Sequence, residues 1–128
     1  MKHAERRLHD YLADIVQAQR RIDAYITALE VTDFLRNHLV QDAVVRNFEI
    51  IGEASKHILQ RFPDFVAANP ELPLVIAYRL RNIVAHGYHE VDYQLVWDTV
   101  LQDLPDLAMK VRSCLEGLCG DAARGEPE

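Results

Sequence analysis

Apolar residues recur at three- and four-residue steps along most of the 128-residue chain, which is the pattern of amphipathic helices. In segment 6–29 these positions are Leu8, Tyr11, Leu12, Ile15, Ile22, Tyr25, Ile26 and Leu29. In segment 42–62 the corresponding face is formed by Val44, Phe48, Ile51, Ser55, Ile58 and Phe62. We therefore predict a long helix over each segment. Thr32 and Asp33, which are typical N-cap residues, predict a short extra helix over 31–37.

Proline and glycine mark the boundaries of the next elements. Pro63, Pro70 and Pro73 are expected to bracket a connecting loop, because proline inside a helix loses a backbone hydrogen bond. A third helix is predicted over 74–85. It should stop near Gly87, since glycine best tolerates the left-handed conformation of a helix C-terminus.

A fourth helix is predicted over 93–118, with Asp92 as its N-cap and with a kink or break at Pro105. Its inward positions are expected to be Trp97, Val100, Leu101, Leu104, Leu107 and Val111. No segment shows the sustained period-two alternation of a strand. The predicted fold class is therefore all-α, an antiparallel four-helix bundle with one short extra helix.

Composition fits one domain that folds without disulfides or metal, since 49% of the residues are hydrophobic and 27% are charged. We assign residues 1–119 to this helical domain and the small, polar segment 120–128 to a flexible C-terminal tail. Cys114 and Cys119 are too few for a disulfide framework and are expected to be half-buried thiols. With neither a membrane-spanning run nor a secretory signal, the chain is expected to be cytoplasmic.

Polar side chains crowd the end of the otherwise apolar third helix. Helical spacing places Asn82 and His86 on one face, with Arg79 one turn earlier. Arg81 lies on an adjacent face, and its long side chain can lean across. Tyr88 comes just past the predicted helix end. One small patch is therefore predicted to hold a guanidinium, an amide, an imidazole and a phenol.

This set of groups suits phosphodiester chemistry. Arginine offers a fixed fork of donors to phosphate oxygens and to the charge of a transition state, and histidine transfers protons near neutral pH. RNA carries its own nucleophile, the 2′-hydroxyl, so its cleavage requires no metal. The plainer interpretation is that Arg81 and His86 only cap helix carbonyls or pair with Glu90 and Asp92.

Residues 81–88 match the R-N-x-x-x-H-x-Y signature of the HEPN superfamily, in the form found in HepT-like toxins. Residues 43–54 resemble the second-helix block of that family, and residues 91–92 and 96–97 resemble its post-motif segment. The three blocks stand in the family's order, and the similarity spans roughly residues 5–118.

The resemblance implies a homodimeric ribonuclease toxin whose two R-x4-H motifs meet at a cleft between protomers. Arg81 and His86 would be catalytic, and Asn82 would orient the phosphate or the histidine. Cleavage would need no metal or cofactor and would leave a 2′,3′-cyclic phosphate. The implied antitoxin of this type VII toxin–antitoxin pair is a small MntA-like nucleotidyltransferase, which attaches AMP to Tyr88 and so blocks the site.

Glu49 and Glu53 lie at i, i+4 on the second long helix, with Arg46 before them. In a dimer they would approach Arg81 and, with Arg79, support the site; the alternative is an ordinary ion pair within the helix. Gly52 lies mid-helix, where glycine costs about 1 kcal/mol relative to alanine. It is expected to allow close approach of another helix, the motif helix or one of the partner protomer.

Two other functions stay open. The first is a metal enzyme that uses His86, His89, Glu90 and Asp92, although no second histidine pair accompanies them. The second is a non-catalytic helical subunit that docks a nucleotidyltransferase and presents its substrate. The charge bears on the ribonuclease hypothesis, because 14 basic against 20 acidic residues give a net charge of −6, which by itself argues against a nucleic-acid surface. A dimer would confine the basic groups to one cleft, so RNA would bind there alone.

Overall fold

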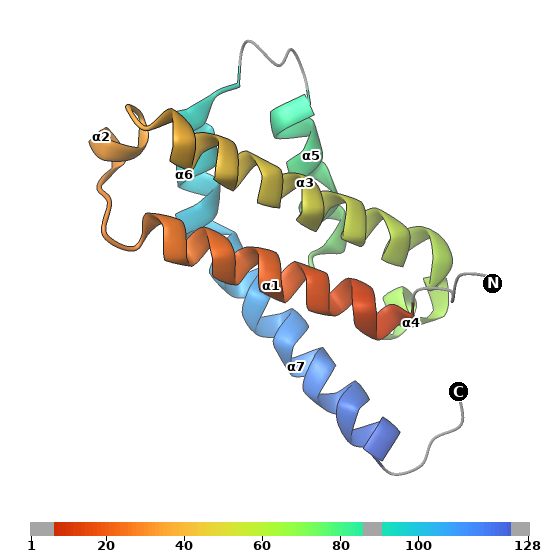
Figure 1. The fold of residues 1–128 in the computed structure, drawn as a ribbon. Helices are drawn as coiled ribbons and strands as arrows, with labels where there is room; N and C mark the ends of the chain where they lie inside the picture. Colours follow the sequence, from red (N-terminus) through yellow and green to blue (C-terminus); the bar gives the residue numbers. More distant parts are fainter. Residues whose placement is uncertain (1–6, 86–90, 124–128) are drawn as a thin grey trace, which may run out of the picture.

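The computed structural model describes residues 7–85 and 91–123, and all of its regular structure in this part is helical (Figure 1). The elements are α1 (Leu8–Ile26), α2 (Val31–Phe34), α3 (His38–Arg61), α4 (Pro63–Ala68), α5 (Leu74–Ala85), α6 (Tyr93–Gln102) and α7 (Leu104–Ala123). The all-α prediction is confirmed. Among the described residues, no helix combines the length and the apolar character needed to cross a membrane.

Side-chain caps fix where several helices begin. Asp92 Oδ1 accepts a hydrogen bond of 3.0 Å from the Leu95 amide and caps α6, as predicted. Asn37 Oδ1 accepts one of 3.0 Å from the Val40 amide, so α3 begins at His38 rather than near residue 42. The prediction for α2 is wrong in register. Glu30 is its N-cap residue, and Asp33 lies in the first turn, where it accepts from the Glu30 amide at 3.0 Å.

Proline acts at two of the predicted boundaries. Pro63 ends α3 but opens the short helix α4, because a residue without an N–H fits the first turn of a helix. The predicted loop after Pro63 is to that extent wrong. Pro105 confirms the predicted break, since it stands in the first turn of α7, after α6 has ended at Gln102. The α7 helix then continues to Ala123, into the segment 120–128 that its composition predicts to be a tail.

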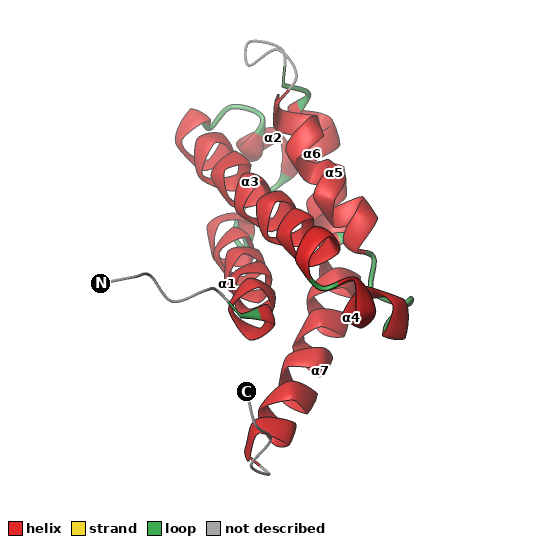
Figure 2. Ribbon diagram, turned by 90° about the vertical axis from the view of Figure 1, so that its right-hand side faces the viewer, coloured by secondary structure: helices red, strands yellow, loops and turns green. Residues whose placement is uncertain are grey.

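The packing places α3 at the centre of the fold. One side of α3 contacts α1 and the other contacts α5, while α7 packs on α1 and α6 (Figure 2). Figure 1 shows α1 and α3 side by side and running in opposite directions, as predicted for an antiparallel bundle. The short helix α2 is tied to α3 because Gln41 Nε2 donates a hydrogen bond of 3.0 Å to the Phe34 carbonyl oxygen.

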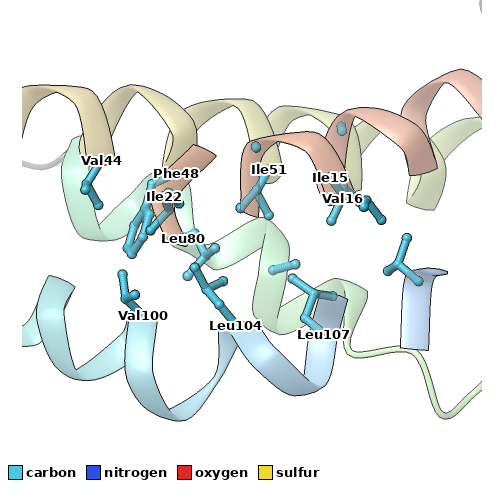
Figure 3. Packing of buried hydrophobic residues seen from close by; sticks show 14 of the residues in the cluster. Ile15, Val16, Ile22, Val44, Phe48, Ile51, Leu80, Val100, Leu104 and Leu107 are labelled. Carbon is cyan, nitrogen blue, oxygen red and sulfur yellow. The ribbon is translucent and has the colours of Figure 1, made fainter. Parts of the chain in front are cut away.

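The core lies between these helices and is built from the predicted apolar faces (Figure 3). Its largest fully buried side chains include Phe34, Phe48, Leu12, Ile15, Ile22, Ile51, Ile58 and Leu104. Each such side chain contributes roughly 1.5–3 kcal/mol by leaving water. Two predicted inward positions are wrong: Tyr25 is exposed and Leu101 is 54% exposed. Since neighbouring helical residues point about 100° apart, Leu101 faces outward where Val100 faces the core.

Candidate active site

The motif helix α5 is held against the core by one apolar stripe. Leu74, Ala77, Leu80 and Val84 are buried at successive steps of three, three and four residues. Arg81 follows Leu80 and lies four residues after Ala77, so it stands at the edge of this stripe, where α5 meets α3. The same pattern that packs α5 therefore fixes the position of the Arg81 backbone.

Gly52 of α3 lies directly against α5 at Arg81. A Cβ atom placed on Gly52 would lie 2.9 Å from the Arg81 Cβ, 3.1 Å from the Arg81 backbone nitrogen and 3.3 Å from the Tyr78 carbonyl oxygen. These neighbours are backbone atoms and a Cβ atom, so no side-chain rotation can move them away. The predicted close approach is confirmed, and the helix that approaches is the motif helix of the same chain.

The residue after Gly52 binds the motif arginine. Glu53 Oε2 lies 3.0 Å from Arg81 Nε, and the two side chains are 45% and 33% exposed. This pair forms within one protomer, whereas the spacing led us to expect Glu53 to approach Arg81 in a dimer. The Arg81 guanidinium carbon also lies 5.7 Å from the centre of the Tyr78 ring, a distance at which a cation is attracted to an aromatic face.

The geometry of this ion pair leaves Arg81 suited to a second anion. Glu53 engages Nε, which carries one of the five N–H donors of a guanidinium. The other four donors are on the two terminal nitrogens, in the planar fork that matches phosphate oxygens. Glu53 thus orients the arginine and lowers its local charge without taking the donors that a phosphate prefers.

Glu49 takes a different partner. Its carboxylate lies 3.8 Å from Arg46 Nη1, one turn away on α3, and both side chains are exposed. This is the ordinary ion pair within a helix that the spacing also allows, and such exposed pairs contribute about 0–1 kcal/mol. Of the two carboxylates predicted to support the site, Glu53 therefore reaches Arg81 and Glu49 stays beside it.

The remaining predicted site residues divide between the α5 surface and the undescribed part of the chain. Arg79 and Asn82 are exposed on α5, and the buried Leu80 separates Arg79 from Arg81 along the helix. His86 and Tyr88 lie outside the described residues, as do His89 and Glu90 of the alternative metal set. Asp92, the last member of that set, caps α6. Within 7–85 and 91–123, no three His, Cys, Asp or Glu side chains form a group that could hold a metal ion.

A hollow opens beside Arg81, and we call it the α1–α3–α5 hollow. Its volume is about 490 Å³. It is lined by Tyr11 and Asp14 of α1, by Arg46, Glu49, Ile50, Glu53, Ala54 and His57 of α3, and by Arg81 of α5. Arg81 and both predicted carboxylates therefore share one concave surface.

His57 and Tyr11 in this hollow are residues that sequence reasoning missed. The His57 ring stacks on the Tyr11 ring with centres 5.1 Å apart, and Arg61 Nη1 donates a hydrogen bond of 3.3 Å to the Tyr11 hydroxyl. His57 is half-buried on α3. One signal was available, because His57 lies four residues after Glu53 and so shares its helix face.

The prediction for Cys114 is confirmed, since its thiol is half-buried on α7. Burial raises the pKa of Cys114 above its ordinary value, and the Glu71 carboxylate adds a smaller effect in the same direction. Its Sγ lies 3.9 Å from Asn69 Oδ1, which suits a thiol donor. The side chain of Cys119 is outside the described part of the structure.

Comparison with known proteins gives a family. A family model described as "Ribonuclease HepT-like" matches residues 15–114, which include α3, the motif and most of α7. The chain is 41% identical over 101 residues to "Probable ribonuclease HepT" of Thermococcus cleftensis, which covers 79% of this chain and 89% of that protein. It is 32% identical over 108 residues to "Putative RNase MJ1380" of Methanocaldococcus jannaschii, covering 84% and 96%. No solved structure matches it significantly.

Proposed function

Because the chain belongs to the HepT-like ribonuclease family of the HEPN superfamily, we propose that it is a metal-independent endoribonuclease. The observation that carries this proposal is the position of the Arg81 guanidinium. Glu53 Oε2 lies 3.0 Å from Arg81 Nε and orients it, next to the close contact between Gly52 and Arg81. Arg81 opens the segment 81–88 that matches the family motif, and its terminal nitrogens suit a phosphate.

In the proposed reaction, the 2′-hydroxyl oxygen of RNA attacks the neighbouring phosphorus and the bond from phosphorus to the 5′-oxygen breaks. The proton of the 2′-hydroxyl is removed and a proton is delivered to the 5′-oxygen, so the products end in a 2′,3′-cyclic phosphate and a 5′-hydroxyl. Arg81 stabilises the negative charge that builds up on the phosphate oxygens. His86 transfers a proton, and Asn82 orients the phosphate or the imidazole.

The proposed active form is a homodimer in which two such motifs face one cleft. The chain has a net charge of −6, so a single copy offers only a small basic area for RNA. Arg79 is exposed on α5, Arg81 is partly exposed where α5 meets α3, and two-fold symmetry would bring two copies of this motif to one cleft. Since Glu53 already orients Arg81 within one protomer, the contribution of the second protomer would be its own motif.

Cleavage of RNA in excess EDTA tests the enzyme proposal. The wild-type protein should cleave and should leave cyclic phosphate ends, whereas His86→Ala should lose activity by about 10²–10⁴-fold, the usual worth of a positioned acid or base. His38→Ala is the matched control, because His38 is exposed at the start of α3, outside the hollow. Equal activity in the wild type and His86→Ala would overturn the mechanism.

The proposed regulation is AMP transfer to Tyr88 by a cognate MntA-like nucleotidyltransferase, the antitoxin of a type VII pair. A bulky anionic group two residues from His86 would offset the Arg81 charge and obstruct the RNA. Co-expression with that enzyme should add the mass of AMP, and Tyr88→Phe should abolish the adduct. Tyr25→Phe, at an exposed tyrosine on α1, should keep it. An adduct that survives Tyr88→Phe would contradict this assignment.

The second candidate function is a non-catalytic subunit that docks a nucleotidyltransferase. One observation favours this second function: the Glu53 carboxylate already neutralises much of the Arg81 charge. Expression of the chain alone separates the two functions. A nuclease should arrest growth and His86→Ala should relieve the arrest, whereas a docking subunit should be harmless in both forms.

A further inference from the structure

The α1–α3–α5 hollow lies directly against the phosphate-binding group of the proposed reaction. Arg81 forms part of its wall, and so does Glu53, which holds Arg81. Its volume of about 490 Å³ falls within the range of roughly 300–1,000 Å³ that is usual for small-ligand sites. Because each phosphate of RNA joins two nucleosides, a strand held by Arg81 brings a neighbouring base to the mouth of the hollow.

The charge of the lining favours a base over a second phosphate. Two arginines and three carboxylates line the hollow, so with His57 neutral it carries a formal excess of one negative charge. With one phosphate already held by Arg81, that excess would repel a second phosphate but not a neutral base. Ile50 and the half-buried His57 ring, which is stacked on Tyr11, supply apolar and aromatic surface that suits the flat face of a base.

Of the two α3 carboxylates that line the hollow, Glu49 is better able than Glu53 to bind the edge of such a base. Glu53 is committed to Arg81 at 3.0 Å, whereas Glu49 lies 3.8 Å from the exposed Arg46. An ion pair this exposed is weak and exchanges its partner at little cost. A carboxylate only accepts hydrogen bonds, so it pairs with amino groups such as those of cytosine and guanine. Uracil offers one N–H that lies between two carbonyl oxygens, and a carboxylate repels both of these oxygens.

We propose that the α1–α3–α5 hollow is the subsite for the nucleobase next to the scissile phosphate, and that Glu49 makes it prefer bases with an amino group. Guanine is the best fit, because its N1–H and N2 amino group point the same way and match both oxygens of one carboxylate. The proposal rests on the proposed function, since Arg81 must hold the phosphate that brings the base to the hollow.

The experiment is cleavage of an RNA pool of random sequence, with the new ends identified by sequencing. At one position beside the cut, the wild type should disfavour uracil about tenfold, which corresponds to ~1.4 kcal/mol. Glu49→Gln should lose most of this preference while it still cleaves, because an amide both donates and accepts. Glu116→Gln is the matched control, since Glu116 is exposed on α7, and it should keep the wild-type preference.

Two results would overturn the subsite: no base preference at either neighbouring position, or the same preference in Glu49→Gln as in the wild type. Both leave Arg81-dependent cleavage intact and so leave the proposed function standing. If the protein does not cleave RNA, titration of the wild type with guanosine and with uridine still tests the hollow. In NMR spectra, guanosine should shift the backbone amide signals of residues 46–57 more than uridine does. Equal or absent shifts would overturn the subsite.

Discussion

Replacing Gly52 with alanine should weaken the fold and the active site together. The new Cβ would lie 2.9 Å from the Arg81 Cβ, shorter than real Cβ contacts, and 3.1 Å from the Arg81 nitrogen, which is tighter than most of them. Alanine gains about 1 kcal/mol over glycine within a helix, whereas overpacking a close contact costs typically 1–3 kcal/mol. The expected net change is therefore a loss of roughly 0–2 kcal/mol in the free energy of unfolding.

Gly117→Ala isolates the contact from the helix preference. Gly117 lies within α7, and a Cβ placed on it meets nothing within 4 Å. This variant should gain about 1 kcal/mol of stability, so Gly52→Ala should lie roughly 1–3 kcal/mol below it. Urea unfolding of the two variants and the wild type measures this difference.

RNA cleavage by the same two variants reports on the site. To relieve the overlap, α5 must move away from α3, and Arg81 moves with it. A misplacement of about 1 Å costs on the order of 10²-fold in rate, so kcat/KM of Gly52→Ala should fall by about that factor or less, and that of Gly117→Ala should not change. If Gly52→Ala is as stable as Gly117→Ala and fully active, the two helices do not meet at this point.

Three further predictions address the site, the core and the thiol. Glu53→Gln should lower kcat/KM about tenfold, or ~1.4 kcal/mol, at unchanged stability, and a wild-type rate would contradict its orienting role. Leu104→Ala should cost about 2–5 kcal/mol in urea unfolding and the exposed Leu101→Ala under about 0.5, so equal losses would contradict the α6–α7 register. Cys114 should react with iodoacetamide more slowly than a free thiol at the same pH, because its raised pKa leaves less thiolate, and should speed up at higher pH; an equal rate would contradict its burial.

The faces of the helices could be predicted from sequence where one apolar stripe dominates. The stripes of α1 and α3 are buried largely as their spacing indicates, and the Asp92 cap and the Pro105 break follow from local chemistry. Leu101 shows the limit, because its spacing from Trp97 and Leu104 assigns it to the core although its side chain is 54% exposed. Because the helix breaks between α6 and α7, the buried face of each helix is set separately by its own packing.

The site could be predicted only in part. The motif identifies Arg81, and a glycine in mid-helix indicates a close contact. Neither feature shows which helix packs against Gly52. Glu49 and Glu53 are equivalent in spacing, and only the packing of α5 on α3 gives Arg81 to Glu53. The α1–α3–α5 hollow was beyond prediction, because Tyr11 and His57 lie far apart in the sequence and meet only through the packing of α1 on α3.

The central claim is that Arg81, oriented by Glu53 within its own protomer, stabilises the negative charge on the phosphate that the 2′-hydroxyl attacks during RNA cleavage. The most direct measurement is the cleavage rate of a short RNA in excess EDTA for the wild type, Arg81→Ala and Arg21→Ala, an exposed arginine of α1. Arg81→Ala should be slower by about 10²–10³-fold, the usual worth of one preorganised charge-stabilising group, and Arg21→Ala should match the wild type. Wild-type cleavage by Arg81→Ala would contradict the claim.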